Sequence, residues 1–138
     1  MEVSVKRITW QQALPIRHQV LWSHKPIEFC KVESDDEAWH FGAVINGEVV
    51  CCASVFIDGS SARLRKFATL EQYQGQGIGS KVVRKILSEL NSSGFSEFWC
   101  DARESAVGFY QRLGMTRSGE RFFKSNVPYF KMRMSIRI

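Results

Sequence analysis

The chain has 138 residues, of which 44% are hydrophobic, 12% aromatic and 24% charged, and its formal net charge is +5. This composition is typical of a globular protein, and we predict one domain over residues 1–138 that buries roughly two thirds of its unfolded surface in a single core. No apolar run approaches the ~18 residues of a membrane span, and the scattered basic residues argue against nucleic-acid binding.

The first elements are a strand and a helix. Val3 and Val5 mark a short strand, and Thr9 with Gln12 forms a capping-box pattern for a helix that runs to about Trp22. Pro15 leaves two alternatives open. The helix either begins near this proline, which is tolerated in a first turn, or is kinked there.

The next segment changes from an irregular to a strand-like pattern. Residues 23–38 are irregular or weakly helical and contain an acidic cluster over residues 33–37, which is typical of a solvated loop. From residue 40 the hydrophobic period becomes two, and the strand-like run from Val49 to Ile57 follows. Asn46-Gly47 and Asp58-Gly59 favour tight hairpin turns, so we predict an antiparallel meander.

A glycine-rich junction follows the third strand of this meander. Residues 64–70 are predicted to form a strand, and residues 74–79 read Gln-Gly-Gln-Gly-Ile-Gly. The following helix has one apolar face, which consists of Ile78, Val82, Val83, Ile86, Leu87 and Leu90. Glycines let the backbone approach a ligand closely, and the first amides of a helix have no partners within it. The junction therefore predicts a site for a pyrophosphate.

Other interpretations of the glycines fit less well. A Walker loop needs Gly-Lys-Ser/Thr, whereas the order here is Gly79-Ser80-Lys81. A dinucleotide fingerprint needs its first glycine directly after the strand, whereas residues 71–74 intervene, and Ser80 occupies the position of its third glycine. A glycine-rich turn that only packs the helix against the strand remains an alternative.

The last elements complete a mixed sheet. Residues 91–94 end the helix, and residues 95–101 are predicted to form a strand parallel to the preceding one, because a helical crossover joins the two. A shorter helix over 106–113 follows. Runs around 121–124 and 130–136 are predicted to form an antiparallel pair.

Cysteines and histidines give no sign of a metal site. The four cysteines lack Cys-x-x-Cys spacing, and the neighbours Cys51 and Cys52 would point to opposite faces of a strand. The three histidines also lack the spacing of a shared metal. We expect buried, reduced thiols and no metal. The first residues do not resemble a signal peptide, so a cytoplasmic location is expected.

Three segments together resemble a known family. Gln74, Gly77 and Gly79 match the Gln/Arg-x-x-Gly-x-Gly/Ala signature of the GNAT family of N-acetyltransferases. Residues 109–115, Phe-Tyr-Gln-Arg-Leu-Gly-Met, are similar to the end of a later helix of that family, with methionine in place of the last aromatic residue. A weaker likeness lies at residues 126–129. The resemblance covers nearly the whole chain.

The resemblance implies a fold and a cosubstrate. The fold is of the α/β (α+β) type, with a mixed, mostly antiparallel sheet flanked by helices and two central parallel strands that splay apart, as in the acyl-CoA N-acyltransferase fold. Acetyl-coenzyme A (acetyl-CoA) would bind between these strands, with its thioester carbonyl polarised by the backbone around Thr69. The expected cofactor-binding residues are Phe67, Ala68, Thr69, Gln74, Gly75, Gln76, Gly77, Ile78, Gly79, Ser80 and Tyr110. Lys81, Arg84 and Lys85 would add an attractive field for the phosphates.

The resemblance also implies catalytic roles. Tyr110 matches the tyrosine that lies near the thioester sulfur, and we expect it to be the general acid, although it also fits an ordinary core tyrosine. Thr69 acts through its main chain. The general base stays open, because residues 62–70 contain no carboxylate; the candidates are Glu71, His40, Glu104 and a chain of waters.

Two hypotheses for the function follow. The first is an acetyl-CoA-dependent N-acetyltransferase that uses direct attack by a primary amine of a small molecule or a peptide. The alternative is a coenzyme A-binding sensor or regulatory module without turnover. The acidic cluster at residues 33–37 could attract a cationic amine. Homodimers are common among similar proteins, but the sequence specifies no interface.

Overall fold

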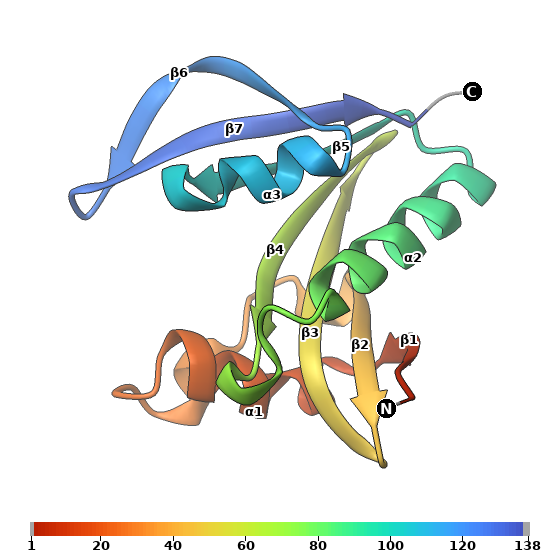
Figure 1. The fold of residues 1–138 in the computed structure, drawn as a ribbon, viewed down its shortest axis with the longest axis vertical. Coiled ribbons are helices and arrows are strands. Elements are labelled where there is room, and N and C mark those ends of the chain that lie inside the picture. Colours follow the sequence, from red (N-terminus) through yellow and green to blue (C-terminus); the bar gives the residue numbers. More distant parts are fainter. Residues whose placement is uncertain (1, 137–138) are drawn as a thin grey trace. The chain divides into compact units, whose positions relative to one another are not determined.

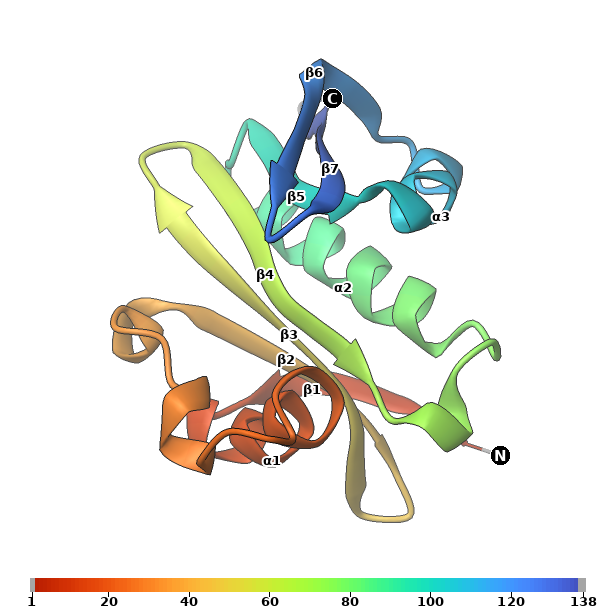
Figure 2. The same cartoon turned by 90° about the vertical axis from the view of Figure 1, so that its left-hand side faces the viewer.

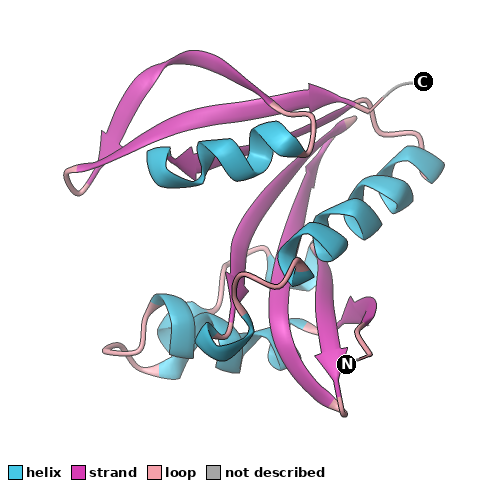
Figure 3. Cartoon of the chain, viewed as in Figure 1, coloured by secondary structure: helices cyan, strands magenta, loops and turns pink. Residues whose placement is uncertain are grey.

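The computed structural model describes residues 2–136. Within this range the chain forms seven strands and three α-helices, linked by turns and short 3-10 helices (Figures 1 and 3). The strands are β1 (Ser4–Ile8), β2 (Trp39–Ile45), β3 (Glu48–Asp58), β4 (Ser61–Thr69), β5 (Glu97–Arg103), β6 (Thr116–Lys124) and β7 (Val127–Ser135). The α-helices are α1 (Trp10–Leu21), α2 (Ile78–Ser92) and α3 (Val107–Arg112). The 3-10 helices are η1 (Ile27–Cys30), η2 (Asp35–Glu37), η3 (Glu71–Tyr73) and η4 (Glu104–Ala106). None of the helices in the described range is long and apolar enough to cross a membrane.

The strands form a sheet in the order β1-β2-β3-β4-β5-β7-β6. β1–β2, β2–β3, β5–β7 and β6–β7 are antiparallel pairs. β4 and β5 are parallel, with Ser61 to Arg63 opposite Glu97 to Trp99. The predicted mixed, mostly antiparallel sheet with one helical crossover is confirmed.

The chain divides into two compact units. The first contains the chain up to Phe56 together with Leu64–Ile86, and the second contains Ile57–Arg63 and the chain from Leu87 onward. The expected splaying of β4 and β5 beyond Arg63 relates one unit to the other, so it stays a prediction, as does the single domain.

Strand β3 is the centre of the first unit. Its residues from Val50 to Val55 are all fully buried. Figure 2 shows why, because α1 and the first half of α2 lie on opposite faces of β2 and β3. A strand covered on both faces has a continuous apolar run, which explains why the sequence of β3 does not alternate.

The two adjacent cysteines of β3 point to opposite faces, as predicted. The Cys52 thiol is 3.9 Å from the carbonyl oxygen of Ala13 in α1. Cys51 instead accepts a hydrogen bond from the Thr69 hydroxyl, over 3.2 Å. All four cysteines of the chain are buried and unpaired. The expectation of buried thiols is confirmed.

Helix α1 begins at its capping box. The Thr9 hydroxyl accepts a bond from the Gln12 amide over 3.1 Å, and the Gln12 side chain accepts one from the Thr9 amide over 2.8 Å. The helix continues through Pro15 to Leu21. A start at Pro15 is therefore excluded.

A buried ion pair ties the segment after α1 to the core. Arg17 of α1 and Asp35 of η2 are 0% and 1% exposed, and form two hydrogen bonds of 2.7 and 2.9 Å. Arg17 also donates to the carbonyl of Cys30 over 3.0 Å and to the hydroxyl of Ser54 over 2.8 Å. Asp35 thus differs from the solvated acidic residues that the sequence predicted. Burying this carboxylate is feasible because a guanidinium faces it.

His40 of β2 belongs to the same buried cluster. Its Nε2 is 2.9 Å from the Asp35 carbonyl oxygen and its Nδ1 is 2.7 Å from the Ser54 hydroxyl. A carbonyl can only accept, so Nε2 carries the proton and Nδ1 accepts from Ser54. Burial lowers the pKa of His40 below its usual 6.5, outweighing the opposite effect of Asp35.

The second unit contains β5, β7, β6 and α3. The first two are paired from Glu97 with Ser135 to Arg103 with Tyr129. β6 begins at Thr116, earlier than the predicted run at 121–124. Gly119 has φ +80°, and the pairing of β6 shifts nearby, which interrupts the alternation that marks a strand. β5 begins two residues late because the Phe95 amide bonds to Leu90 and closes α2.

We predict that Asp35→Ala lowers the free energy of unfolding by about 3–5 kcal/mol, because it leaves the Arg17 guanidinium buried without its counter-ion. The matched control is Glu37→Ala, an exposed carboxylate of the same acidic cluster. Its effect should stay within about 0.5 kcal/mol. Urea unfolding measures both, and equal effects would contradict a dominant role of the pair.

His40 should make the stability depend on pH. Because its pKa is lowered in the folded state, the unfolded chain binds a proton more readily below pH 6.5. The contribution is therefore full above pH 6.5 and is lost as the pH falls from there towards the folded-state pKa. Asp35, whose pKa is also lowered, acts in a separate window below its usual value of 3.8. The stability of the wild type should fall as the pH decreases below 6.5, whereas His40→Gln should lack this fall. Exposed His24→Gln is the control and should behave like the wild type. Melting curves recorded over this pH range provide the measurement.

Candidate active site

The glycine loop connects β4 to α2 through η3 in the first unit. Gly75 and Gly77 have φ of +75° and +80°, a region that side-chain-bearing residues rarely adopt. Both are exposed, and a Cβ on either would meet no atom within 4 Å. The glycines are therefore required by the backbone conformation and not by crowding within the protein.

The start of α2 presents free main-chain donors. Its first helical hydrogen bond joins the Lys81 amide to the Gly77 carbonyl, over 3.2 Å. The amides of Ile78, Gly79 and Ser80 precede this bond and have no carbonyl one turn back in the helix. With the helix dipole, these donors attract anions such as phosphate. Exposed Lys81 and Arg84 on the same helix add positive charge.

Two glutamines fix the loop against the preceding turn. Gln74 donates through Nε2 to the carbonyl of Thr69, over 2.9 Å, and Gln76 donates to the carbonyl of Gln72, over 3.1 Å. The Gln74 bond joins the end of β4 to the loop. This contact gives the signature glutamine a structural purpose that the sequence alone did not reveal.

Main-chain groups of β4 alternate between two edges. The Leu70 amide bonds to the Val50 carbonyl of β3 over 2.9 Å, and the Ala68 amide interacts with the Cys52 thiol. Since successive residues of a strand direct their amides to opposite sides, Phe67 and Thr69 direct theirs to the edge away from β3. Ala68, which the sequence included among the binding residues, bonds inward to β3.

Lys66 interrupts the regular geometry of β4. Its φ is +54°, which is strained for a residue with a side chain. The carbonyl of Lys66 accepts a contact from the Cys52 thiol at 3.6 Å. The strained residue therefore lies directly before Phe67 in the strand. Nothing in the sequence pattern indicates it.

Tyr110 lies on α3 of the second unit. It is 8% exposed, and its ring contacts Phe109 edge to face with centroids 5.1 Å apart. Burial raises the pKa of Tyr110 well above its usual value, and the neighbouring Cys100 thiol of β5 acts in the same direction. Burial likewise raises the pKa of Cys100 to about 12. Tyr110 is therefore protonated at neutral pH and can donate a hydrogen bond, although the raised pKa makes it a weaker acid than a free tyrosine.

The candidates for the general base differ in their surroundings. His40 is buried with both ring nitrogens engaged, which makes it a structural residue. Glu71 is exposed on η3 in the first unit, and Glu104 is exposed on η4, 3.7 Å from Arg121. Among residues 2–136, no group of three or more His, Cys, Asp or Glu side chains could hold a metal ion.

The fold is shared with solved structures of N-acetyltransferases. A putative N-acetyltransferase from Lactobacillus plantarum superimposes with a TM-score of 0.86 at 13% identity over 99% of both chains. The ribosomal-protein-S18-alanine N-acetyltransferase from Escherichia coli gives 0.82 at 18% identity, over 99% of this chain and 96% of that one. A Thermoplasma acidophilum paia N-acetyltransferase in complex with coenzyme A gives 0.73 at 12% identity, over 98% and 99%. These structures confirm the acyl-CoA N-acyltransferase fold.

Sequence comparison establishes the family. Residues 22–136 match the family model described as an acetyltransferase (GNAT) domain. The chain is 34% identical over 129 residues to an uncharacterized N-acetyltransferase, YitI, of Bacillus subtilis (strain 168), covering 87% of each. The chain belongs to the GNAT acetyltransferase family and is an N-acetyltransferase.

Proposed function

We propose that the protein transfers the acetyl group of acetyl-CoA to a primary amine, by direct attack within a ternary complex. The observation that carries this proposal is the loop at Gly75 and Gly77 together with the first turn of α2, whose unpaired amides are arranged in a way that suits a pyrophosphate. The coenzyme A complex of the fold relative from Thermoplasma acidophilum supports the choice of ligand.

The cosubstrate would be held mainly by main-chain groups. The amides from Gly75 to Ser80 bind the pyrophosphate in this proposal, whereas the expected Gln74 amide already bonds to the Glu71 carbonyl over 3.2 Å. The outward edge of β4, at Phe67 and Thr69, binds the pantetheine arm and donates a hydrogen bond to the thioester oxygen. Such a donor favours the reaction because negative charge develops on this oxygen in the transition state.

The reaction then consists of one acyl transfer. The amine nitrogen forms a bond to the carbonyl carbon, the carbon–sulfur bond breaks, and the products are an amide and free coenzyme A. Tyr110 gives its proton, or a strong hydrogen bond, to the leaving thiolate. The base takes the proton of the attacking amine. At pH 7.4 an alkylammonium with a pKa of about 10.4 is roughly 0.1% deprotonated, so this second proton transfer is the harder one.

The state of the thiols supports direct attack over a covalent enzyme intermediate. Burial raises the pKa of Cys51 to about 11 and that of Cys52 to about 12. Cys100 has a similarly raised pKa, and Cys30 is buried. A thiol must be both ionised and accessible to act as a nucleophile, and the four buried thiols do not meet both conditions.

The decisive experiment measures release of free thiol from acetyl-CoA in the presence of a panel of primary amines. We expect at least one amine to raise the release above the background and to yield its N-acetyl derivative by mass spectrometry. Binding of acetyl-CoA without any such acceptor would instead favour a coenzyme A sensor, an alternative that the absence of a carboxylate from β4 suggests.

We predict that Tyr110→Phe lowers kcat by about tenfold to a thousandfold and leaves the affinity for acetyl-CoA nearly unchanged, because only the proton donor is lost. The matched control is Tyr129→Phe, the same change on β7, where the ring stacks on Phe122. Steady-state kinetics with the best amine of the panel provides the measurement. Equal turnover of Tyr110→Phe and wild type would remove this hydroxyl from the mechanism.

We predict that Gly77→Val weakens coenzyme A binding by about tenfold or more, because a β-branched side chain disfavours the positive φ that directs the loop amides outward. Gly59→Val is the control, since Gly59 has φ +62° in an open turn and carries the same backbone strain elsewhere. Calorimetric titration with coenzyme A compares the two. Unchanged affinity of a folded Gly77→Val would contradict the proposed contacts.

A further inference from the structure

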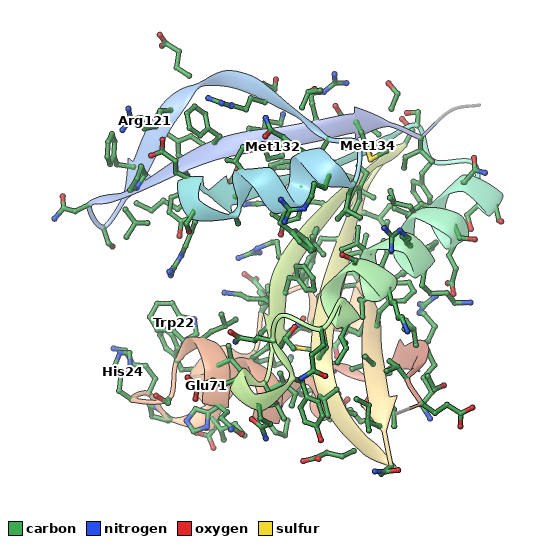
Figure 4. The ribbon with its side chains drawn as sticks, in the orientation of Figure 1. Trp22, His24, Glu71, Arg121, Met132 and Met134 are labelled. Atoms are coloured by element: carbon green, nitrogen blue, oxygen red, sulfur yellow. The ribbon has the colours of Figure 1, made fainter. Side chains whose placement is uncertain are left out.

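The strands of the second unit have one buried face and one partly exposed face. Phe98, Cys100 and Met132 belong to the buried face and are at most 2% exposed. Figure 4 shows Met132 and Met134 where β7 runs beside α3. Successive side chains of a strand point to opposite faces, so the residues that alternate with these lie on the other face. That face is half-buried to exposed.

The strand register brings charged side chains together on the partly exposed face. Arg63 of β4 lies opposite Trp99 of β5, and Asp101 of β5 lies opposite Lys131 of β7. Ser118 of β6 lies on the other side of Lys131. All of them belong to the second unit. We call the following residues the basic face: Arg63, Glu97, Trp99, Asp101, Arg103, Ser118, Phe122, Lys124, Tyr129, Lys131 and Arg133.

Cations are in excess on the basic face. It carries five cationic side chains and two carboxylates, which gives a net charge of +3. Asp101 is 3.0 Å from the Arg63 Nη2 and 3.3 Å from the Lys124 Nζ, so one carboxylate faces two cations. Glu97 is 2.7 Å from the Nε of Arg133. The other two cations, Arg103 and Lys131, lie outside these ion pairs and give the face its capacity to attract an anion.

Aromatic rings hold several of these cations in place. The Arg63 guanidinium and the Lys131 ammonium each lie 4.7 Å from the ring centroid of Trp99. The Lys124 ammonium lies 4.9 Å from that of Tyr129. The chain's own cations therefore occupy these rings, which act as supports and not as ligand sites. A supported cation keeps N–H donors for a ligand, and its fixed position lowers the entropy cost of binding.

The pattern of the basic face favours a nucleic acid as the ligand. Its cations come from four strands, so they are scattered along the sequence but lie together in the fold. The scatter that argues against nucleic-acid binding in the sequence is therefore absent from the folded surface. An array of fixed cations suits a chain of phosphates, and a guanidinium plane such as that of Arg63 can stack on an unpaired base. An acidic peptide offers no such base.

We propose that the basic face binds single-stranded RNA, mainly through its phosphates and without strong sequence preference. Arg103 and Lys131 contact phosphates, and the partly exposed Arg63 guanidinium contacts a base. The Ser118 and Tyr129 hydroxyls on the same face are the partners for 2′-hydroxyl groups, which DNA lacks. This inference goes beyond the proposed function and does not depend on it.

Fluorescence anisotropy of a labelled single-stranded RNA of about 12 nucleotides, a length that one small domain can cover, measures the binding. We expect the affinity to fall with salt, with a slope of log K against log salt concentration of about −2, as three neutralised phosphates would give. No binding at about 50 mM salt, or an affinity that does not depend on salt, would overturn the inference.

A double variant tests the two cations outside the ion pairs. Arg103→Gln combined with Lys131→Gln should weaken RNA binding by about tenfold or more and make the salt slope shallower by about 1.4, the value for two lost phosphate contacts. The matched control is Lys6→Gln combined with Lys25→Gln, which changes the net charge equally at exposed positions of the first unit. Equal weakening in both double variants would overturn the assignment to this face.

A second variant keeps every cation in place. Ser118→Glu adds a carboxylate beside Lys131 and should also weaken RNA binding, whereas Ser4→Glu, at an exposed position of β1, should not. Coenzyme A affinity equal to that of the wild type shows that each variant is folded. Wild-type RNA affinity in a folded Ser118→Glu would contradict the proposed contacts.

Competition experiments identify the ligand and the site. Single-stranded DNA and an RNA duplex of the same sequence should bind more weakly, and oligoglutamate of equal charge should not displace the RNA. Equal binding of the DNA or the duplex, or displacement by oligoglutamate, would overturn the choice of single-stranded RNA. Saturating coenzyme A should leave RNA binding unchanged. Displacement by coenzyme A would place the RNA at the anion site of α2 and overturn the inference, whatever the outcome of the acetylation assay.

Discussion

The unsatisfied amides at the start of α2 are the feature on which the proposed chemistry depends. An isolated helix would leave these donors to water, but here Gly75 and Gly77 turn the backbone so that the loop and the first helical turn present donors together. The Gln74 side chain fixes this turn to the end of β4. One short stretch of main chain thus provides the anion site. The same stretch connects this site directly to β4, the strand that would hold the thioester.

A site of this kind constrains backbone conformation more than side-chain identity. The fold as a whole also tolerates many side-chain changes, because relatives with TM-scores of 0.73 to 0.86 are only 12 to 18% identical to this chain. Because the site consists mainly of main-chain groups, side-chain motifs say little about which residues of this chain take part in catalysis. Phe67 and Thr69 are the candidates for binding the cosubstrate because their amides point to the edge of β4 away from β3. Ala68 lies between them, and its amide points towards Cys52 of β3. A list of sequence positions does not distinguish these cases.

The sequence predicted those features that local rules determine. The capping box at Thr9, the hairpin turns and the apolar face of α2 depend on residues within a few positions of each other, and the structure confirms them. It did not predict the Arg17–Asp35 pair, because the partners are separated along the chain and the acidic cluster resembles a solvated loop. The positive φ of Lys66 was equally hidden, since a lysine gives no signal for it. The roles at the site, including those of Tyr110 and Thr69, stay predictions.

The distribution of charge suggests how the protein could distinguish the cosubstrate, the amine substrate and the acetylated product. Within the first unit, exposed Lys81 and Arg84 lie on α2, and the acidic segment follows α1, which covers the opposite face of β2 and β3 (Figure 2). A polyanionic cosubstrate and a cationic amine would therefore be attracted by different segments of the unit, which limits competition between them. Acetylation removes the charge of the amine, so the product loses the attraction that concentrated its precursor.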